Sequence, residues 1–152
     1  RLRIIRSFSG KIYMKKGQFL GDVSPREAWD ALQSHPETML VDVRTRAEWA
    51  YVGGPDLSSL HKPLIQVEWL MFPSMAFNPQ FLEELQAYGI KPGPVLYMIC
   101  RSGARSHQAA ELLADYGYAT YNVADGFEGQ LDEMGHRGVG GWRAENLPWR
   151  QG

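Results

Sequence analysis

Short apolar runs rich in β-branched residues alternate with helical patterns along most of this chain, and this alternation limits the fold more than any other feature. Residues 39–43, 95–99 and 119–123 predict buried strands, and Pro63 confines a further strand over residues 62–67 to a sheet edge. Strands that alternate with helices form a parallel sheet with helices on both faces. The sequence therefore predicts an α/β fold whose site lies where strands end and helices begin.

Helical patterns fill the segments between these strands. Ser24 and Glu27 flank Pro25 in a capping-box pattern, which predicts a helix that runs to about residue 35. Further helices are expected over residues 47–51, after Asn78-Pro79, over residues 106–116 and over residues 127–134. No internal repeat interrupts this order, so we expect one domain.

Composition limits the compartment and the partners. The chain has 152 residues, 44% of them hydrophobic, and a formal net charge of −1, which gives no signal for nucleic acid or membrane. A single cysteine forms no internal disulfide and no secretory signal is visible, so a reducing cytoplasm is expected. The four histidines lack the paired spacing of a zinc site, and we expect neither a metal nor another cofactor.

The first sixteen residues carry six basic residues and no acidic residue. Such a stretch is typical of a transit peptide or a basic arm, but a vector-derived or weakly ordered extension is the favoured interpretation. We therefore expect an extension over residues 1–17, tag-derived on this interpretation, and a domain over residues 18–152.

The single cysteine, Cys100, directly follows the most apolar predicted strand. The loop from Cys100 to Arg105 is short and has to curl, which Ser102 and Gly103 make sterically easy. Inward N–H groups, the N-terminus of the next helix, Arg101 and Arg105 would all favour an anion there, so the thiol should ionise more readily than free cysteine, whose pKa is about 8.5. A buried inert cysteine is the alternative, but packing alone does not explain two arginines in such a loop.

With these residues in place, the segment from Ile99 to Ser106 resembles the rhodanese family, whose signature is a Cys-Arg-x-Gly-x-Arg loop of this length. Residues 41–44 with Glu48-Trp49 are similar to the family's first motif, and residues 125–129 to its last-strand exit. The ending over residues 135–149 is similar to that of bacterial single-domain members. The resemblance covers roughly residues 21–151 and implies a single rhodanese-like domain.

The resemblance also implies an activity, that of a thiosulfate:acceptor sulfurtransferase working through a cysteine persulfide on Cys100. The backbone N–H groups of Arg101, Ser102, Gly103, Ala104 and Arg105 would steady the persulfide. The two arginines would engage the charge of the donor. The implied partners are a small sulfur donor such as thiosulfate and an acceptor that is a thiol, cyanide or another protein.

Three residues of the first motif have expected structural roles. Arg44 and Glu48 are expected to form an ion pair, with Asp42 as a hydrogen-bond acceptor near the loop. In the tail, Trp142 and Trp149 are expected to fold back over the domain.

One departure from the family pattern follows the first motif. Where the family commonly has Gly-His-Ile-Pro-Gly-Ala, residues 52–57 read Val-Gly-Gly-Pro-Asp-Leu. The aromatic and Met-rich stretch over residues 69–77 comes next. We expect it to cover a sheet edge, with an acceptor surface or a lid beside the site as the alternative.

Three other functions stay open. A cysteine phosphatase or arsenate reductase of the related fold has one more residue between cysteine and arginine, whereas Cys100 and Arg105 enclose four. A non-enzymatic rhodanese-like interaction module usually has the cysteine replaced. A sulfur-relay module differs only in that its acceptor is another protein.

Overall fold

The centre of the molecule is a five-stranded sheet in which all strands are parallel and the spatial order is β3-β10-β9-β4-β6. The computed structural model describes the backbone of residues 2–6 and 12–152 and the side chains from residue 17 onward. The sheet strands are β3 (Gln18–Val23), β4 (Met39–Asp42), β6 (Ile65–Gln66), β9 (Val95–Ile99) and β10 (Ala119–Val123). The predicted α/β class is confirmed, and β6 lies at an edge of the sheet, as predicted from Pro63. The other edge strand, β3, was missed because its residues are mostly half-exposed and show no apolar run.

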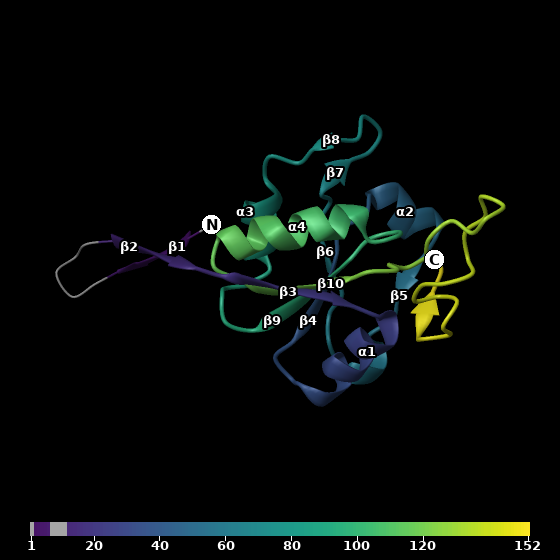
Figure 1. Cartoon of the computed structure of the whole chain (residues 1–152), viewed down its shortest axis with the longest axis horizontal. Helices are drawn as coiled ribbons and strands as arrows, with labels where there is room; N and C mark the ends of the chain where they lie inside the picture. The colour runs from purple at the N-terminus through teal and green to yellow at the C-terminus, as the bar shows by residue number, and fades with distance from the viewer. Residues whose placement is uncertain (1, 7–11) are drawn as a thin grey trace.

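Helices cover both faces of this sheet. They are α1 (Pro25–Ser34), α2 (Arg46–Tyr51), α3 (Phe81–Ala87) and α4 (Ala104–Asp115), with a short 3-10 helix, η1 (Ser58–Leu60). Figure 1 shows α3 and α4 on one side of the sheet and α1 on the other. The predicted arrangement of helices on both faces is therefore confirmed.

Strand β9 contributes alternate side chains to the two halves of the core. Leu96, Met98 and Cys100 belong to the apolar cluster that packs under α3 and α4. Tyr97 and Ile99 belong to the cluster on the α1 side. This alternation is the ordinary two-residue period of a strand. It places Cys100 at the carboxyl end of the middle strand, on the side of α4.

The N-terminus of α1 has the predicted capping box. The Ser24 hydroxyl accepts a hydrogen bond from the Glu27 N–H at 3.1 Å, and the Glu27 carboxylate accepts one from the Ser24 N–H at 2.9 Å. Two otherwise unsatisfied N–H groups are paired in this way.

Three two-stranded sheets lie outside the central sheet. They are β1 (Leu2–Arg6) with β2 (Ile12–Lys16), β7 (Leu70–Met71) with β8 (Ala76–Phe77), and β5 (Gly54–Pro55) with β11 (Trp149–Arg150), all antiparallel. The predicted extension over residues 1–17 falls partly on residues 1 and 7–11, outside the described residues. Its described part forms the β1–β2 hairpin, which Figure 1 shows extending away from the sheet.

The helix predicted over residues 127–134 is wrong. The Phe127 and Glu128 carbonyls, which a helix would pair with residues 131 and 132, accept hydrogen bonds from the Arg143 N–H at 3.1 Å and the Gly138 N–H at 3.0 Å. The N–H groups of Phe127 and Glu128 donate to the carbonyls of Cys100 and Arg101 at 2.8 and 2.9 Å. Gly126 has a φ of 62°, and a Cβ there would lie 2.5 Å from the Arg101 carbonyl oxygen. The segment after β10 therefore supports the loop as a series of turns.

The C-terminal tail packs against the domain, as predicted. Trp142 is fully buried, its ring lies 5.9 Å from that of Trp29, and its Nε1 donates to the Pro148 carbonyl at 2.8 Å. The ring of Trp149 lies 6.0 Å from that of Phe127. Aromatic rings bury large apolar areas, so these contacts anchor the irregular tail.

Candidate active site

The thiol of Cys100 lies at the carboxyl end of β9 and is only 1% exposed. Its sulfur accepts hydrogen bonds from the Gly103 N–H at 3.1 Å and the Ser106 N–H at 3.3 Å, and the Ser106 hydroxyl oxygen lies 3.2 Å from it. Both N–H donors come from the N-cap or the first turn of α4, where the helix presents its positive end. The surroundings of the sulfur favour a negatively charged atom.

The curl of the loop depends on Gly103. This residue is the N-cap of α4, with a φ of 107°, and a Cβ there would collide with the Ala124 carbonyl oxygen. Only glycine combines this backbone conformation with such a close approach. Of the loop residues predicted to direct N–H groups inward, Gly103 is the one whose N–H reaches the sulfur, together with Ser106 beyond the loop.

Two buried polar residues behind the sulfur, Ser106 and Asn122, were not predicted. The Ser106 hydroxyl lies 2.6 Å from the Asn122 Oδ1 atom, and the Asn122 amide nitrogen donates to the Asp22 carboxylate at 3.0 Å and to the Gly103 carbonyl at 3.2 Å. These contacts fix the position of the hydroxyl beside the thiol. An asparagine inside an otherwise apolar strand was the sequence signal that could have indicated it.

The side chain of Arg105 is held by Glu48. The two guanidinium nitrogens donate to the two carboxylate oxygens at 2.7 and 2.9 Å, an arrangement that fixes the direction of both side chains. The predicted ion pair between Arg44 and Glu48 is therefore wrong. Glu48 lies at the third position of α2, which points it at α4, while Arg44 is turned into the core.

Arg44 instead pairs with Asp42, and both side chains are completely buried. The guanidinium donates to the carboxylate at 2.7 and 3.0 Å and to the Gly53 carbonyl at 2.7 Å, and it lies 4.6 Å from the centre of the Phe127 ring. Burial by itself would lower the pKa of Arg44, but Asp42 outweighs it and the pKa is raised. Asp42 is thus a hydrogen-bond acceptor, as predicted, and its partner is the arginine two residues along the chain.

The pair between Glu48 and Arg105 predicts a pH dependence of stability. Burial by itself would raise the pKa of Glu48, but hydrogen bonds from Arg105 and from the Thr45 N–H, together with the charges of Arg105 and Arg44, lower it from 4.5 to about 2. A lowered pKa in the folded state stabilises the protein above the unfolded-state pKa, and this contribution disappears as the pH falls towards 2. We expect Glu48→Gln to reduce the free energy of unfolding by about 3 kcal/mol at neutral pH and by almost nothing near pH 2.

Urea denaturation followed by tryptophan fluorescence, repeated across this pH range, measures the difference. Glu111→Gln is the matched control, because Glu111 is half-exposed and its carboxylate lies 3.9 Å from His107. The control should follow the wild type at every pH. A difference between Glu48→Gln and the wild type that stays constant with pH would contradict the assignment.

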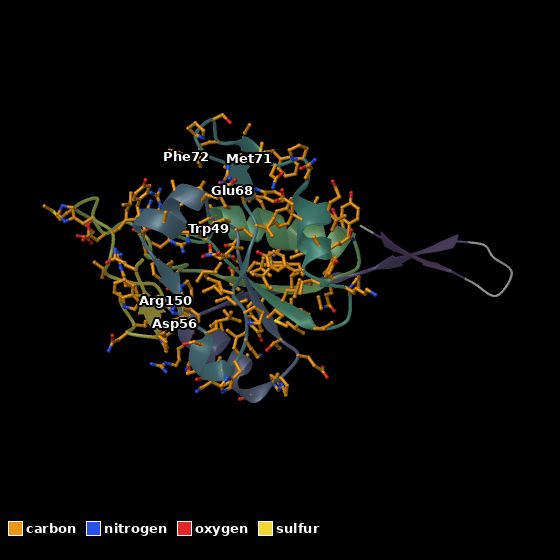
Figure 2. The ribbon with its side chains drawn as sticks, turned by 180° about the vertical axis from the view of Figure 1, so that it is seen from behind. Trp49, Asp56, Glu68, Met71, Phe72 and Arg150 are labelled. Carbon is orange, nitrogen blue, oxygen red and sulfur yellow. The ribbon has the colours of Figure 1, made fainter. Side chains whose placement is uncertain are left out.

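Arg101 differs from Arg105 in being exposed. Both arginines line a groove of about 530 Å³ between α2 and the β7–β8 hairpin. Figure 2 shows Phe72 and Met71 of this hairpin with Glu68 and Trp49 below them. Within the stretch over residues 69–77, Trp69 is buried in the core, whereas Phe72, Met75 and Phe77 are exposed.

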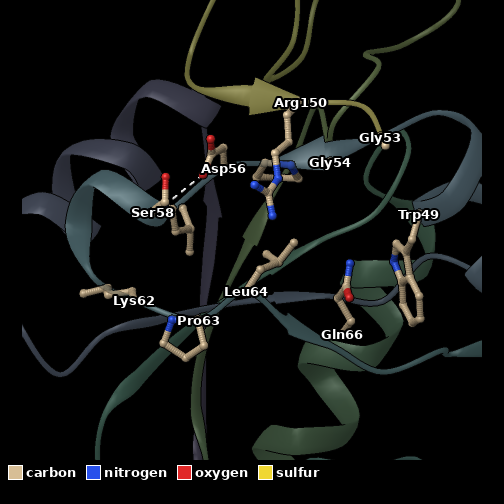
Figure 3. A pocket seen from close by; sticks show the side chains of 13 residues that line it. Trp49, Gly53, Gly54, Asp56, Ser58, Lys62, Pro63, Leu64, Gln66 and Arg150 are labelled. Atoms are coloured by element: carbon tan, nitrogen blue, oxygen red, sulfur yellow. Dashed lines mark hydrogen bonds between the residues drawn. The ribbon is translucent and has the colours of Figure 1, made fainter.

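A second, more polar cavity of about 400 Å³ lies around the β5 segment. Figure 3 shows the Arg150 side chain directed into it, with Asp56 accepting a hydrogen bond from the Ser58 N–H. Its lining residues lie between Trp49 and Gln66 and at Arg150 and Gly152. None of them belongs to the Cys100 loop. The groove between α2 and the hairpin, by contrast, is lined by two residues of the Cys100 loop, Arg101 and Arg105.

Two further findings concern the described part of the chain. Among these residues, no group of three or more His, Cys, Asp or Glu side chains could hold a metal ion. Within the same residues, no helix combines the length and the apolar character that crossing a membrane requires.

A parallel five-stranded sheet with a cysteine loop between its middle strand and the next helix is a rhodanese-like fold. The family model described as the STR4 middle domain matches residues 20–152, and the chain belongs to this family. It is 36% identical to the uncharacterized protein RP600 homolog of Rickettsia rickettsii, over 85% of this chain and 96% of that protein. It is 27% identical to rhodanese-like domain-containing protein 4, chloroplastic, of Arabidopsis thaliana, over 91% of this chain and 28% of that protein.

Two solved structures have a similar fold. The crystal structure of Rv0390 from M. tuberculosis is 48% identical, with a TM-score of 0.82, and the match covers 89% of this chain and all of that chain. The polysulfide-sulfur transferase homodimer from Wolinella succinogenes is 24% identical, with a TM-score of 0.58 over 86% of this chain and 78% of that chain. The second match supports the fold alone.

Proposed function

We propose that the protein is a thiosulfate:acceptor sulfurtransferase that carries sulfur as a persulfide on Cys100. The observation that carries this proposal is the pair of backbone N–H donors, from Gly103 and Ser106, to the buried Cys100 sulfur. Hydrogen bonds to a charged sulfur are stronger than those to a neutral thiol, so the site stabilises a thiolate and the terminal sulfur of a persulfide. Relatives named as rhodanese-like support sulfur transfer as the general chemistry.

The proposed reaction has two steps that need no oxidant. The Cys100 thiolate attacks the outer sulfur of thiosulfate, a new S–S bond forms, and the bond to the SO₃ group breaks to release sulfite. An external nucleophile, such as cyanide, a thiol or a protein thiol, then takes the outer sulfur and regenerates the thiolate. The protein supplies the nucleophile and stabilises the anion. A free thiol of this kind suits the reducing cytoplasm that the sequence favours.

The loop residues have separate roles in this proposal. Arg101 is exposed and meets the negative charge of the donor, whereas the charge of Arg105 is offset by Glu48, which fixes the position of the Arg105 side chain. The backbone from Ser102 to Ala104 surrounds the persulfide. Arg44, paired with Asp42, packs on the ring of Phe127, whose N–H donates to the Cys100 carbonyl at the start of the loop.

The test is the mass of the intact protein before and after treatment with thiosulfate. We expect wild-type protein to gain one sulfur atom, about 32 Da, and to lose it again when cyanide is added, with formation of thiocyanate. Sulfite, which has no outer sulfur, is the control reagent and should leave the mass unchanged. An unmodified mass after thiosulfate treatment would reject thiosulfate as the donor, and cysteine-dependent release of phosphate from an aryl phosphate would favour the phosphatase alternative.

A further inference from the structure

The groove between α2 and the β7–β8 hairpin has apolar walls beside the reactive thiol. Tyr51 and Val52 form the wall at the end of α2, and Leu70, Phe72 and Met75 form the wall of the hairpin. The groove is about 530 Å³ in volume, which lies within the range of pockets for small organic ligands. It reaches the Cys100 loop through the two arginines that line it.

The apolar side chains of these walls are unusually accessible. Tyr51 is 83% exposed, Phe72 is 54% exposed and Met75 is 42% exposed. These large apolar side chains stay in contact with water until a ligand covers them. Removal of their apolar surface from water then favours binding of the ligand.

The two walls are held in place by Glu68, a side chain that is almost completely buried. Its Oε2 atom accepts hydrogen bonds from the Arg46 N–H at 2.9 Å, at the start of α2, and from the Phe72 N–H at 3.4 Å, in the hairpin. Its backbone carbonyl accepts a hydrogen bond from the Asn78 side chain at 2.9 Å. The groove is therefore formed before any ligand arrives, which lowers the entropic cost of binding.

The charge at the inner end of the groove is positive. Glu48 and Arg105 neutralise each other, whereas Arg101 has no carboxylate partner among residues 17–152. A ligand that fits this arrangement has an anionic group close to its reacting atom and an apolar body that extends away from the thiol.

We propose that this groove binds the sulfur acceptor, and that the acceptor is a small organic thiol with a carboxylate next to the sulfur and an apolar tail. The inference rests on the proposed function, because it assigns the second step of that reaction. The acceptor thiolate forms a bond to the outer sulfur of the Cys100 persulfide, the bond within the persulfide breaks, and the electron pair returns to the Cys100 sulfur. Cys100 is the single cysteine of this chain, so no second thiol of the chain can take the sulfur.

The test compares two acceptors with the same reacting group, α-mercaptooctanoate and α-mercaptopropionate. Protein loaded with thiosulfate and freed from donor is mixed with each thiol, and the loss of the added sulfur is followed by intact mass. We expect the longer acceptor to react at least about tenfold faster, because its tail buries additional methylene groups in the groove. Equal rates would overturn the proposal and would favour a protein partner for the exposed patch.

Two variants test whether the preference for the longer acceptor arises in the groove. In the double variant Phe72→Ser, Met75→Ser the ratio of the two rates should fall to near one, with each rate normalised to transfer to cyanide by the same variant. Tyr116→Ser is the matched control, because Tyr116 is 49% exposed and is not among the residues that line the groove. This control should keep the wild-type ratio, and a ratio that survives in the double variant would overturn the proposal.

A neutral analogue of the acceptor tests the role of the Arg101 charge. The alcohol corresponding to α-mercaptooctanoate should react about threefold more slowly than the acid in wild-type protein, and the two should react equally in Arg101→Gln. An acid preference that persists in this variant would overturn the role of Arg101. Wild-type protein that fails to load sulfur at all would reject the proposed function, whereas normal loading and cyanide transfer without a preference for the longer acceptor would reject only the groove assignment.

Discussion

Replacement of Cys100 by serine is expected to abolish both the sulfur adduct and the formation of thiocyanate. The sulfur atom is the nucleophile of the first step and the carrier in the second, and a hydroxyl cannot replace it in either. Serine is close in size to cysteine and can accept the same hydrogen bonds from Gly103 and Ser106, so the fold should persist. The rate should therefore fall to that of the uncatalysed reaction between thiosulfate and cyanide.

Intact mass and a colorimetric thiocyanate assay check this expectation, and thermal unfolding of the same sample shows whether the variant is folded. Ser102→Ala, which changes a neighbouring hydroxyl without a hydrogen bond to the sulfur, is a suitable comparison for the adduct. An adduct that remains after Cys100→Ser would place the reacting group elsewhere and contradict the proposed mechanism.

Arg44→Met is expected to lower the free energy of unfolding by about 3–5 kcal/mol, because it leaves the Asp42 carboxylate buried without its counter-charge. Both side chains have no exposed surface, so water cannot compensate the loss. The variant also removes the hydrogen bond to the Gly53 carbonyl and the contact with the Phe127 ring. Urea denaturation at neutral pH measures the change.

The double variant Asp42→Leu, Arg44→Met separates the charge from the packing. Because it removes both members of the buried pair, we expect it to be more stable than Arg44→Met alone. The Arg46→Met variant is the control, since the Arg46 side chain is 79% exposed and its closest contact with a carboxylate is 3.8 Å. If the double variant loses as much free energy of unfolding as Asp42→Leu and Arg44→Met lose together, the pair does not act as a unit.

The successes of the sequence predictions lie in patterns that span a few residues. The run over residues 95–99 and the Ser24–Glu27 capping box appear in the structure where they were expected, because a strand and a helix start are specified by neighbouring residues. The position of Cys100 followed from the same pattern, since a buried strand that runs into a short loop leaves the next residue at the edge of the sheet. The helix over residues 127–134 failed because the Phe127 and Glu128 carbonyls pair with N–H groups of the tail, at Arg143 and Gly138, rather than with the next helical turn.

The sequence by itself determined the class of fold and the position of Cys100 in a short loop between a buried strand and a helix. The tertiary structure decided which side chains pair with one another. Glu48 pairs with Arg105, which is 57 residues away, and not with the nearby Arg44, because α2 directs the carboxylate towards α4 while the core encloses Arg44 with Asp42. Likewise, the Ser106 hydroxyl beside the Cys100 sulfur is held by Asn122, which comes from the adjacent strand and lies 16 residues along the chain. Charge and polarity are properties of single residues, but the choice among possible partners depends on which surfaces the packed elements bring together.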